Sequence, residues 1–349
     1  MTARDIIVVG GSAGGVDALQ QVVAGLPADL PAAVFVVVHV PPHGPSALPR
    51  VLSRAGRLRA VHPHDGQSIT PGTIYVAPPD YHLVVKPGHV RLTRGPRENR
   101  HRPAADALFR TAARSYGRRV VGVVLSGALD DGTAGLLAVK EAGGVAVVQD
   151  PADALYDGMP RSALEHVPVD HALPAAELPA LLARLATEPL PEPDGGDPPL
   201  PPGAEQEADM AELEPGATHD PHRSGTPSVF GCPECGGVLW ELHGNDLLRF
   251  RCRVGHAWSA DSLVAEQADG LEAALWSALR ALEEQAALAE RIADRARNRG
   301  HDIAVHKFDG QVREAREHAE LIRKVLLTRR PDPSTGPVPP ATAGGGPSA

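Results

Sequence analysis

The first half of the sequence predicts an α/β fold, a doubly wound and mostly parallel sheet of the Rossmann type. Short runs of valine and isoleucine alternate there with stretches of helical apolar periodicity, the pattern of a parallel sheet with helices on both faces. Polar residues capable of chemistry follow three of these runs. Because ligands bind at the carboxyl ends of such strands, the fold class also predicts where a site lies.

Four buried strands and five helices make up the predicted sheet and its covering layers. The strands are expected at Ile6–Gly10, Val34–Val40, Val120–Ser126 and Val145–Gln149, and the helices near 16–25, 46–54, 104–116, 132–142 and 174–186. Thr73–Val76 is interpreted as a short strand. Leu83–Val85 and Val90–Leu92, joined across Pro87 and Gly88, are interpreted as short strands or a hairpin.

The first strand runs into glycines around a single serine, in the order Gly10-Gly11-Ser12-Ala13-Gly14-Gly15. Glycines tolerate the sharp turn that presents a nucleophilic serine. A dinucleotide loop is the rival interpretation, but it requires Gly-x-Gly-x-x-Gly and an acidic residue after the second strand. This chain has His39 there.

Three strand ends together predict a catalytic triad of Ser12, His39 and Asp131. Serine becomes a nucleophile when a base takes its proton, and a carboxylate fixes the tautomer of that base. Taken singly, each residue has an ordinary alternative: a turn serine, a structural histidine, or an aspartate that caps the next helix. Their coincidence at three strand ends favours the triad over these alternatives.

The second half of the chain has a different composition. Between Thr187 and Ser228 lie ten prolines and ten acidic residues, which predicts an extended, disordered linker over 188–228. The remainder is expected to form a zinc ribbon at 229–260, a helical hairpin at 261–330 and a disordered tail at 331–349. The hairpin, turning near Gly300, is expected to pack on itself, with a partner helix or a homodimer as the alternative.

All three cysteines and one histidine form a metal-ligand pattern: Cys232, Cys235, Cys252 and His256. A C-x2-C knuckle followed by C-x3-H supplies four ligands suited to tetrahedral zinc, the alternative being reduced structural thiols. Four protein ligands leave no open position, so the metal is expected to be structural. The chemistry of the predicted triad, within residues 1–187, is expected to survive removal of the metal.

Composition excludes several classes of function. The formal charge of −9 argues against general nucleic-acid binding. No apolar run is long enough to insert into a membrane, and the chain enters its first strand at once, without a signal peptide. With three cysteines, too few for a disulfide framework, we expect a cytoplasmic protein.

Five motifs in order resemble the catalytic domain of the chemotaxis protein-glutamate methylesterases, over residues 4 to 186. The resemblance implies hydrolysis of glutamate γ-methyl esters on chemoreceptor helices, and in some members deamidation of receptor glutamines. Many members carry an N-terminal receiver domain, which is not expected here. Control is therefore expected to be absent or to run through the C-terminal module or a separate receiver protein, and a receiver or a methyltransferase protein is a further expected partner. The motifs are Gly10–Gly15, Val38–Pro41, His101–Pro103, Leu125–Gly132 and Gly158–Arg161.

The resemblance also implies roles for individual residues, and it implies that catalysis needs no cofactor. Ser12 is implied as nucleophile, His39 as general base and acid, and Asp131 as the orienting carboxylate. Backbone N–H groups of Ala13 and Ala128 are expected to bind the oxyanion, although Ser126-Gly127-Ala128-Leu129 departs from the family's usual sequence there. The expected substrate-binding residues are Arg100, His101, Arg102 and Met159.

Two other classes of function remain as alternatives. The chain is alternatively a non-catalytic signalling scaffold that keeps the fold and only binds a receptor or regulator. A zinc-ribbon nucleic-acid binder is disfavoured because the ribbon has few basic residues.

Overall fold

The computed structural model describes residues 3–40, 46–190, 198–217, 225–244 and 246–328. The chain forms two compact units, with the boundary between Leu263 and Val264. The first unit contains the predicted sheet and ribbon, and the second contains most of the helical hairpin. None of the described helices has the length and apolar character that a membrane span needs.

The first unit is built on a seven-stranded sheet in the order β3-β4-β2-β1-β7-β8-β9, with every pairing parallel. This confirms the predicted fold class. The central strands are rich in valine and isoleucine and are buried throughout, as in parallel sheets covered on both faces. The short edge strands β3 and β9 escaped the sequence analysis because three residues carry no periodic signal. The strands are β1 (Ile6–Gly11), β2 (Ala33–Val38), β3 (Arg59–Val61), β4 (Thr73–Val76), β7 (Val120–Val124), β8 (Val145–Gln149) and β9 (His171–Leu173).

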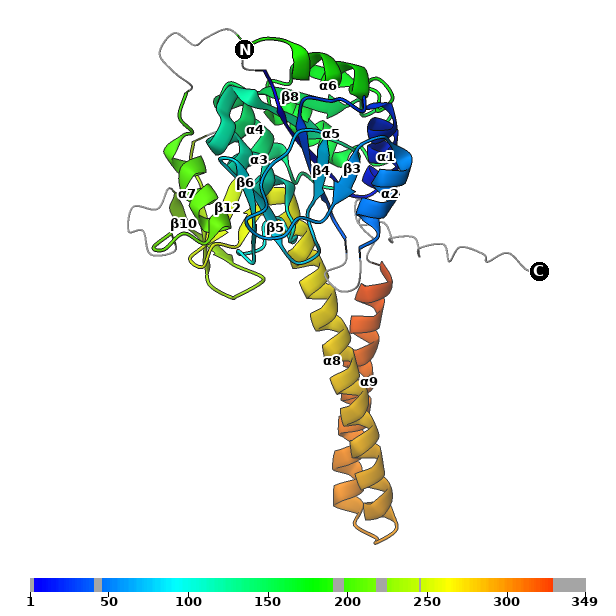
Figure 1. The fold of residues 1–349 in the computed structure, drawn as a ribbon. Coiled ribbons are helices and arrows are strands. Elements are labelled where there is room, and N and C mark those ends of the chain that lie inside the picture. Colours follow the sequence, from blue (N-terminus) through cyan, green and yellow to red (C-terminus); the bar gives the residue numbers. More distant parts are fainter. Residues whose placement is uncertain (1–2, 41–45, 191–197, 218–224, 245, 329–349) are drawn as a thin grey trace, which may run out of the picture. The chain divides into compact units, whose positions relative to one another are not determined.

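Helices cover both faces of this sheet (Figure 1). One apolar cluster joins the sheet to α1 (Gly15–Gly25), α2 (Leu48–Ala55) and α6 (Leu178–Thr187). Another joins the opposite face to α3 (Ala105–Tyr116), α4 (Thr133–Glu141) and α5 (Gly158–His166). Helix α5 was not predicted because its first turn contains glycine and proline; proline is tolerated there because first-turn N–H groups have no partner within the helix. A single 3-10 turn, η1 (Gly117–Arg119), leads into β7.

The predicted hairpin is present as β5 (His82–Lys86) and β6 (His89–Thr93), paired antiparallel. Its turn contains Gly88 at a φ of +77°, a conformation that glycine adopts without strain. Leu83, Val85 and Val90 of the hairpin belong to the same apolar cluster as α3.

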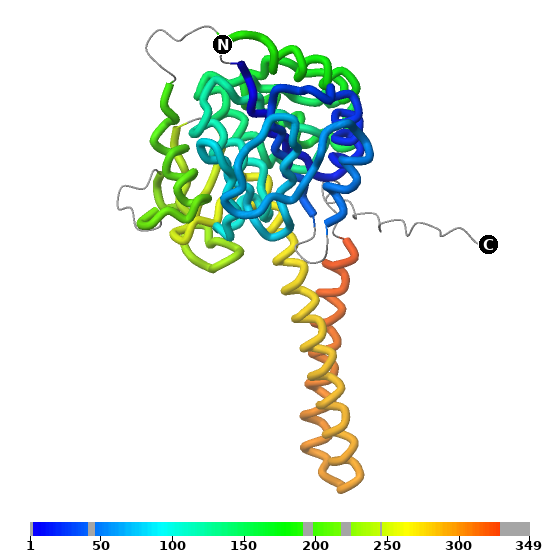
Figure 2. Tube along the Cα trace, in the orientation of Figure 1, coloured from blue at the N-terminus to red at the C-terminus, as the bar shows by residue number. Residues whose placement is uncertain are grey.

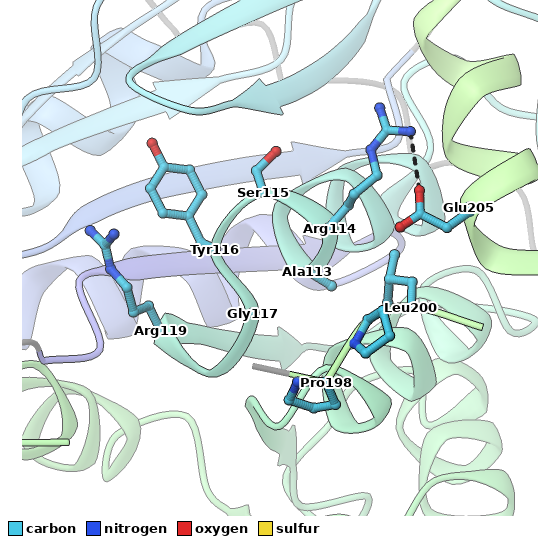
Figure 3. Close-up of a pocket in the computed structure, with 10 residues that line it drawn as sticks. Ala113, Arg114, Ser115, Tyr116, Gly117, Arg119, Pro198, Leu200 and Glu205 are labelled. Carbon is cyan, nitrogen blue, oxygen red and sulfur yellow. Dashed lines mark ion pairs between the residues drawn. The ribbon is translucent and has the colours of Figure 1, made fainter. Parts of the chain in front are cut away.

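The predicted disordered linker is wrong at residues 202–212, which form helix α7 (Pro202–Glu212). Arg114 of α3 pairs with Asp209 at 2.6 Å, with Glu205 at 3.5 Å and with buried Glu212. Figure 3 shows the Arg114–Glu205 pair beside a surface pocket of 360 Å³ that Tyr116 and Leu200 also line. Composition identified the acidic residues of this segment but not the arginines that neutralise them. Residues 191–197 and 218–224 of the predicted linker lie outside the described residues.

The ribbon is a four-stranded antiparallel sheet of β10 (Thr226–Gly231), β11 (Val238–Glu241), β12 (Arg249–Cys252) and β13 (Ala257–Ser259). The sequence predicted the central hairpin but not the outer strands β10 and β13. Its small apolar cluster includes Leu239, Phe250 and Trp258. The ribbon belongs to the same compact unit as the catalytic sheet, which contradicts the expected separation by a flexible tether.

The second unit consists of most of α8 (Ala260–Arg297) and α9 (Asp302–Thr328), which run alongside each other as the predicted hairpin (Figure 2). Ion pairs join the two helices at Arg316–Glu290, 3.0 Å, and Arg323–Glu283, 2.6 Å. The turn contains Gly300 at a φ of +68°. The predicted tail at 331–349 lies outside the described residues.

Candidate active site

The parallel register brings the three predicted catalytic residues to one edge of the sheet. Strand β1 lies between β2 and β7, and Gly11 of β1 is in register with Val38 of β2. Ser12 and His39 are the next residues of their strands and therefore lie side by side. Asp131 reaches the same edge from the loop after β7.

These side chains form one hydrogen-bonded chain. His39 Nδ1 lies 3.1 Å from Ser12 Oγ, and His39 Nε2 lies 2.8 Å from Asp131 Oδ2. Because an ionised carboxylate only accepts hydrogen bonds, Asp131 selects the tautomer with its proton on Nε2. The lone pair of Nδ1 then faces the Ser12 hydroxyl, as a general base requires.

The turn that presents Ser12 is held by backbone hydrogen bonds. The Ser12 N–H donates to the carbonyl of Ser126 at 3.0 Å, and Gly14 has a left-handed φ of +70°. Gly127 must lack a side chain, because a Cβ there would lie 2.0 Å from Met159 Sδ and 3.0 Å from Ser12 Cβ. Met159, predicted to bind substrate, is thus buried beside Ser12 across Gly127.

Asp131 is buried and stabilised as an anion. It accepts hydrogen bonds from the backbone N–H groups of Ala105, 2.6 Å, and Asp106, 3.3 Å, at the start of α3, and from Asn99 Nδ2, 3.1 Å. Burial acts to raise its pKa, but the hydrogen bond and charge of His39 and the Ala105 N–H together hold the pKa below its usual value. Asp131 is therefore ionised at neutral pH.

The neighbouring Asp130 has a different environment. It accepts a hydrogen bond from the Ser259 hydroxyl at 2.7 Å. Burial, with further contributions from the charges of Asp261 and Asp131, raises the pKa of Asp130 to about 7 against the lowering effect of that hydrogen bond. Of the tandem aspartates, only Asp131 contacts His39.

The ring of His101 packs directly against the ring of His39, a member of the triad. Its ring stacks on the His39 ring, with centroids 3.5 Å apart and 13° between the planes. Burial and the nearby His39 hold the pKa of His101 well below its ordinary value, so the ring is neutral at neutral pH. His101 therefore packs against the base, in addition to any contact with substrate.

The two predicted substrate-binding arginines differ. Arg102 is held within the protein by Asp80, at 2.6 Å, and by the Gly95 carbonyl, at 2.8 Å. Arg100 has a left-handed backbone, with φ of +74°, in the loop before His101. We assign Arg102 to the support of this loop, and contact of Arg100 with substrate remains a prediction.

Two backbone N–H groups near Ser12 are unused by the described part of the protein, those of Ala13 and Ala128. Ala13 follows Ser12 directly. Ala128 follows Gly127, whose α-carbon lies against Ser12. The geometry is compatible with the predicted pair of oxyanion donors.

Asn99 is a residue of the site that the sequence analysis missed. Besides Asp131, its Nδ2 donates to Asp106 Oδ2 at 2.9 Å. Burial and the charge of Asp131 raise the pKa of Asp106 well above its ordinary value. The available signal was an asparagine in a polar loop, a residue type enriched at left-handed positions such as its φ of +48°.

The four predicted metal ligands come together in the ribbon. The ligand atoms of Cys232, Cys235, Cys252 and His256 all lie within 4.8 Å of one another. Cys235 Sγ is 3.7 Å from Cys252 Sγ, and His256 Nδ1 is 3.5 Å from Cys252 Sγ. A tetrahedral zinc with Zn–S bonds of about 2.3 Å needs sulfurs about 3.8 Å apart, so these residues fit the ion. Burial and the adjacent thiols raise the pKa of Cys252 to about 12, so its thiolate requires a cation nearby.

On a parallel α/β sheet, Ser12, His39 and Asp131 form the bonded arrangement that a serine nucleophile with a histidine base and an orienting carboxylate would require. The family described as CheB methylesterase matches residues 7–182, half of the chain. This chain therefore belongs to the CheB methylesterase family.

Individual relatives agree with that assignment. The chain is similar to protein-glutamate methylesterase/protein-glutamine glutaminase 5 of Anaeromyxobacter dehalogenans, with 38% identity over 188 residues, 53% of this chain and 52% of the relative. A putative enzyme of the same description from Leptospira interrogans is 37% identical over 182 residues, 52% of this chain and 94% of the relative. The catalytic domain of Thermotoga maritima CheB methylesterase superposes with a TM-score of 0.51 at 33% identity, covering 53% of this chain and 99% of that one. The chain spans about half the length of the first curated relative it matches.

Proposed function

We propose that this protein is a serine hydrolase that removes methyl groups from glutamate γ-methyl esters of methyl-accepting chemoreceptors. The observation that carries the proposal is the bonded chain Ser12–His39–Asp131, which lies inside the region matched by the family. Relatives named protein-glutamate methylesterase support the choice of ester.

In the first step, Ser12 Oγ attacks the ester carbonyl carbon while its proton passes to His39 Nδ1. Asp131 stabilises the imidazolium that forms. The negative charge on the former carbonyl oxygen is stabilised by the N–H groups of Ala13 and Ala128. As the tetrahedral intermediate collapses, His39 returns the proton to the departing methoxide, which leaves as methanol.

In the second step, a water molecule attacks the glutamyl ester on Ser12. His39 takes a proton from this water and returns one to Ser12 Oγ, so that the glutamate carboxylate is released and the enzyme is restored. A glutamine side chain follows the same path with ammonia as the leaving group, so receptor glutamine deamidation is a second proposed activity. Arg100 and His101 are the proposed contacts for the substrate, with Arg102 supporting their loop. Met159 is fully buried, so we propose that it packs behind Ser12 instead of contacting the substrate.

We also propose that the ribbon holds zinc in the Cys232–Cys235–Cys252–His256 site and that the ion is structural, since four protein ligands complete a tetrahedral shell. Such thiols persist in a reducing compartment, which fits the cytoplasm. The proposed partners are chemoreceptor helices.

The test is methanol release from a methylated receptor fragment by the wild type and by Ser12→Ala. We expect release from the wild type and none above background from the variant. Ser53→Ala is the matched control, because the Ser53 hydroxyl bonds only to the backbone of Ala60, away from the site. Receptor binding without methanol release by the wild type would favour the scaffold alternative and overturn the proposal.

A further inference from the structure

The loop that carries His101 is joined to the metal-binding ribbon through its backbone. The N–H of Asn99 donates to the Ala257 carbonyl at 2.9 Å, and the N–H of Ala257 donates to the Arg97 carbonyl at 3.1 Å. Arg97 also pairs with Glu234, in the first cysteine knuckle, at 3.0 Å. Strand β13 of the ribbon thus extends along this loop of the catalytic sheet.

A buried charge cluster fixes the same junction. The Glu98 carboxylate receives two hydrogen bonds from Arg110 of α3, at 2.7 and 2.8 Å, and lies 3.5 Å from Arg251 of the ribbon. All three side chains are buried. Although burial acts to raise the pKa of Glu98, the two arginines hold it below its usual value. Buried charges are tolerated only when paired, so the ribbon has one specific position on the loop.

Asn99 connects this junction to the triad. Its Nδ2 donates to Asp131 Oδ1 and Asp106 Oδ2, and its Oδ1 accepts from the Ser259 N–H at 2.9 Å and the Ser262 hydroxyl at 3.3 Å. The ionised Asp131 carboxylate only accepts and the Ser259 N–H only donates, so the amide has one allowed orientation. The ribbon side therefore determines that the Nδ2 group faces Asp131.

We infer that Asn99 is a positioning residue of the Ser12–His39–Asp131 site, and that the Cys3His ribbon holds it in place. The inference rests on the proposed hydrolase function. In this arrangement Asn99 and the Asp106 N–H hold Oδ1 of Asp131, while Oδ2 faces His39.

The metal site is adjacent in sequence to the residues that make these contacts. His256 immediately precedes Ala257, and the N–H of Cys252 donates to the His256 carbonyl at 3.0 Å. The apolar core of the ribbon is small and includes two of the cysteines themselves, so the ribbon depends on a bound cation for its fold. Loss of the ion releases β13, then Asn99, then the carboxylate of Asp131. Under this inference hydrolysis depends on the metal, in contrast to the expectation drawn from the sequence.

The first experiment replaces Asn99 in the metal-loaded full chain. Asn99→Ala removes one donor to a buried charged group, and we expect kcat to fall about 10- to 100-fold with KM unchanged. An Asp131 with one donor fewer is a stronger base and stabilises positive charge on His39 more strongly, so the acidic limb of kcat/KM moves to higher pH. A general loss of folded protein would lower the amplitude without moving this limb.

A milder variant acts from the ribbon side. Ser262→Ala removes one of the two donors to Asn99 Oδ1 and is expected to lower kcat a few-fold, a fraction of the loss in Asn99→Ala. Ser228→Ala is its control, because the Ser228 hydroxyl bonds to the Leu239 carbonyl inside the ribbon. We expect Ser228→Ala to match the wild type.

The second experiment removes the metal by chelation from the wild type and from Asn99→Ala. Besides methanol release, it measures the rate at which a fluorophosphonate labels Ser12, which requires no receptor. If the ribbon acts through Asn99, stripping slows labelling about 10- to 100-fold in the wild type and adds little in the variant, because coupled changes are not additive.

The inference would be overturned if Ser12 of the metal-free wild type were labelled as fast as in the metal-loaded protein. It would also be overturned if metal removal slowed labelling of Asn99→Ala by the same factor as in the wild type. If the wild type releases no methanol but Ser12 labelling depends on Asn99 and on the metal, the proposed substrate fails and the positioning role stands. Circular dichroism of each sample confirms that the sheet is folded in the comparison.

Discussion

The triad and the Cys3His cluster are both recognisable in the sequence, yet they depend on different parts of the fold. The triad gathers residues 12, 39 and 131 from three strand ends, and backbone pairing of a buried seven-stranded sheet sets their positions. The cysteines and histidine of the ribbon lie within one short stretch, around an apolar cluster of six residues. The first site is organised by its scaffold, whereas we propose that the second needs a bound ion to order its scaffold.

This difference has a consequence for function because the two regions share Asn99. A site whose residues are placed by the sheet is connected through Asn99 to one whose order is proposed to depend on a cation. The predictions below test each region and the junction between them.

The largest effect is expected within the triad. Ser12→Ala, His39→Ala and the double variant should each lose about 10⁴- to 10⁶-fold in kcat, because members of a triad act as one unit. Single-turnover methanol release with thermal melts of each variant is the measurement. Losses that multiply in the double variant would show that Ser12 and His39 act separately.

The tandem aspartates should respond very unequally. Asp131→Asn presents an amide to His39 Nε2 and favours the wrong tautomer, so kcat should fall about 10⁴-fold. Asp130→Asn keeps an acceptor for Ser259 and touches no reacting group, so its kcat should change only slightly. The reverse ranking would assign the orienting role to Asp130.

Removing the metal should destabilise the ribbon by several kcal/mol, since zinc binding to small domains is worth about 10–16 kcal/mol. All three tryptophans, Trp240, Trp258 and Trp276, lie in the ribbon or in α8 and none in the catalytic sheet. Trp258 is buried. Its emission should shift to longer wavelength on chelation and return when zinc is added. An unchanged spectrum after complete loss of bound zinc would mean that the ribbon folds without the ion.

The junction should be sensitive to the loss of one buried charge. Glu98→Gln removes one of the two buried carboxylates that Arg110 and Arg251 share, the other being Glu207, and should cost about 3 kcal/mol of unfolding free energy. Asp157→Asn, at the exposed Arg161–Asp157 pair, is the matched control and should cost no more than about 0.5 kcal/mol. Urea unfolding of both variants measures the difference. Equal small costs would mean that the ribbon is not held by this cluster.

The smallest effect concerns pH. The pKa of Asp130 is raised in the folded state to about 7 from 3.8, so its contribution to stability is present at acid pH and is lost as pH rises toward 7. Asp130→Asn cannot ionise. Relative to the wild type, it should be more stable at pH 8 than at pH 5 by about 2 kcal/mol. A difference from the wild type that is the same at both pH values would contradict the buried, protonated state of Asp130.

The sequence alone predicted the central strands of the sheet, and it picked out the three proposed triad residues and the four cysteine and histidine residues that the structure brings together. Runs of β-branched residues specify buried parallel strands, and a parallel sheet brings its strand ends together wherever its helices pack. The cysteine spacing specifies a metal site because its ligands come from two local turns. These features need only local pattern and one topological rule.

Only the tertiary structure decided how the second half of the chain meets the first. The Ser259–Asp130 bond joins residues 129 positions apart, and Asn99 bonds to Ser259 across 160 positions. By composition the segment of helix α7 was predicted to be a disordered linker, but Arg114 pairs with Asp209 of this helix. By its motif Arg102 was predicted to contact substrate, but it pairs with Asp80. The identity of a polar residue does not specify its hydrogen-bond or ion-pair partner. The partner depends on which polar groups are buried next to one another, and the packing of the whole unit determines which groups those are.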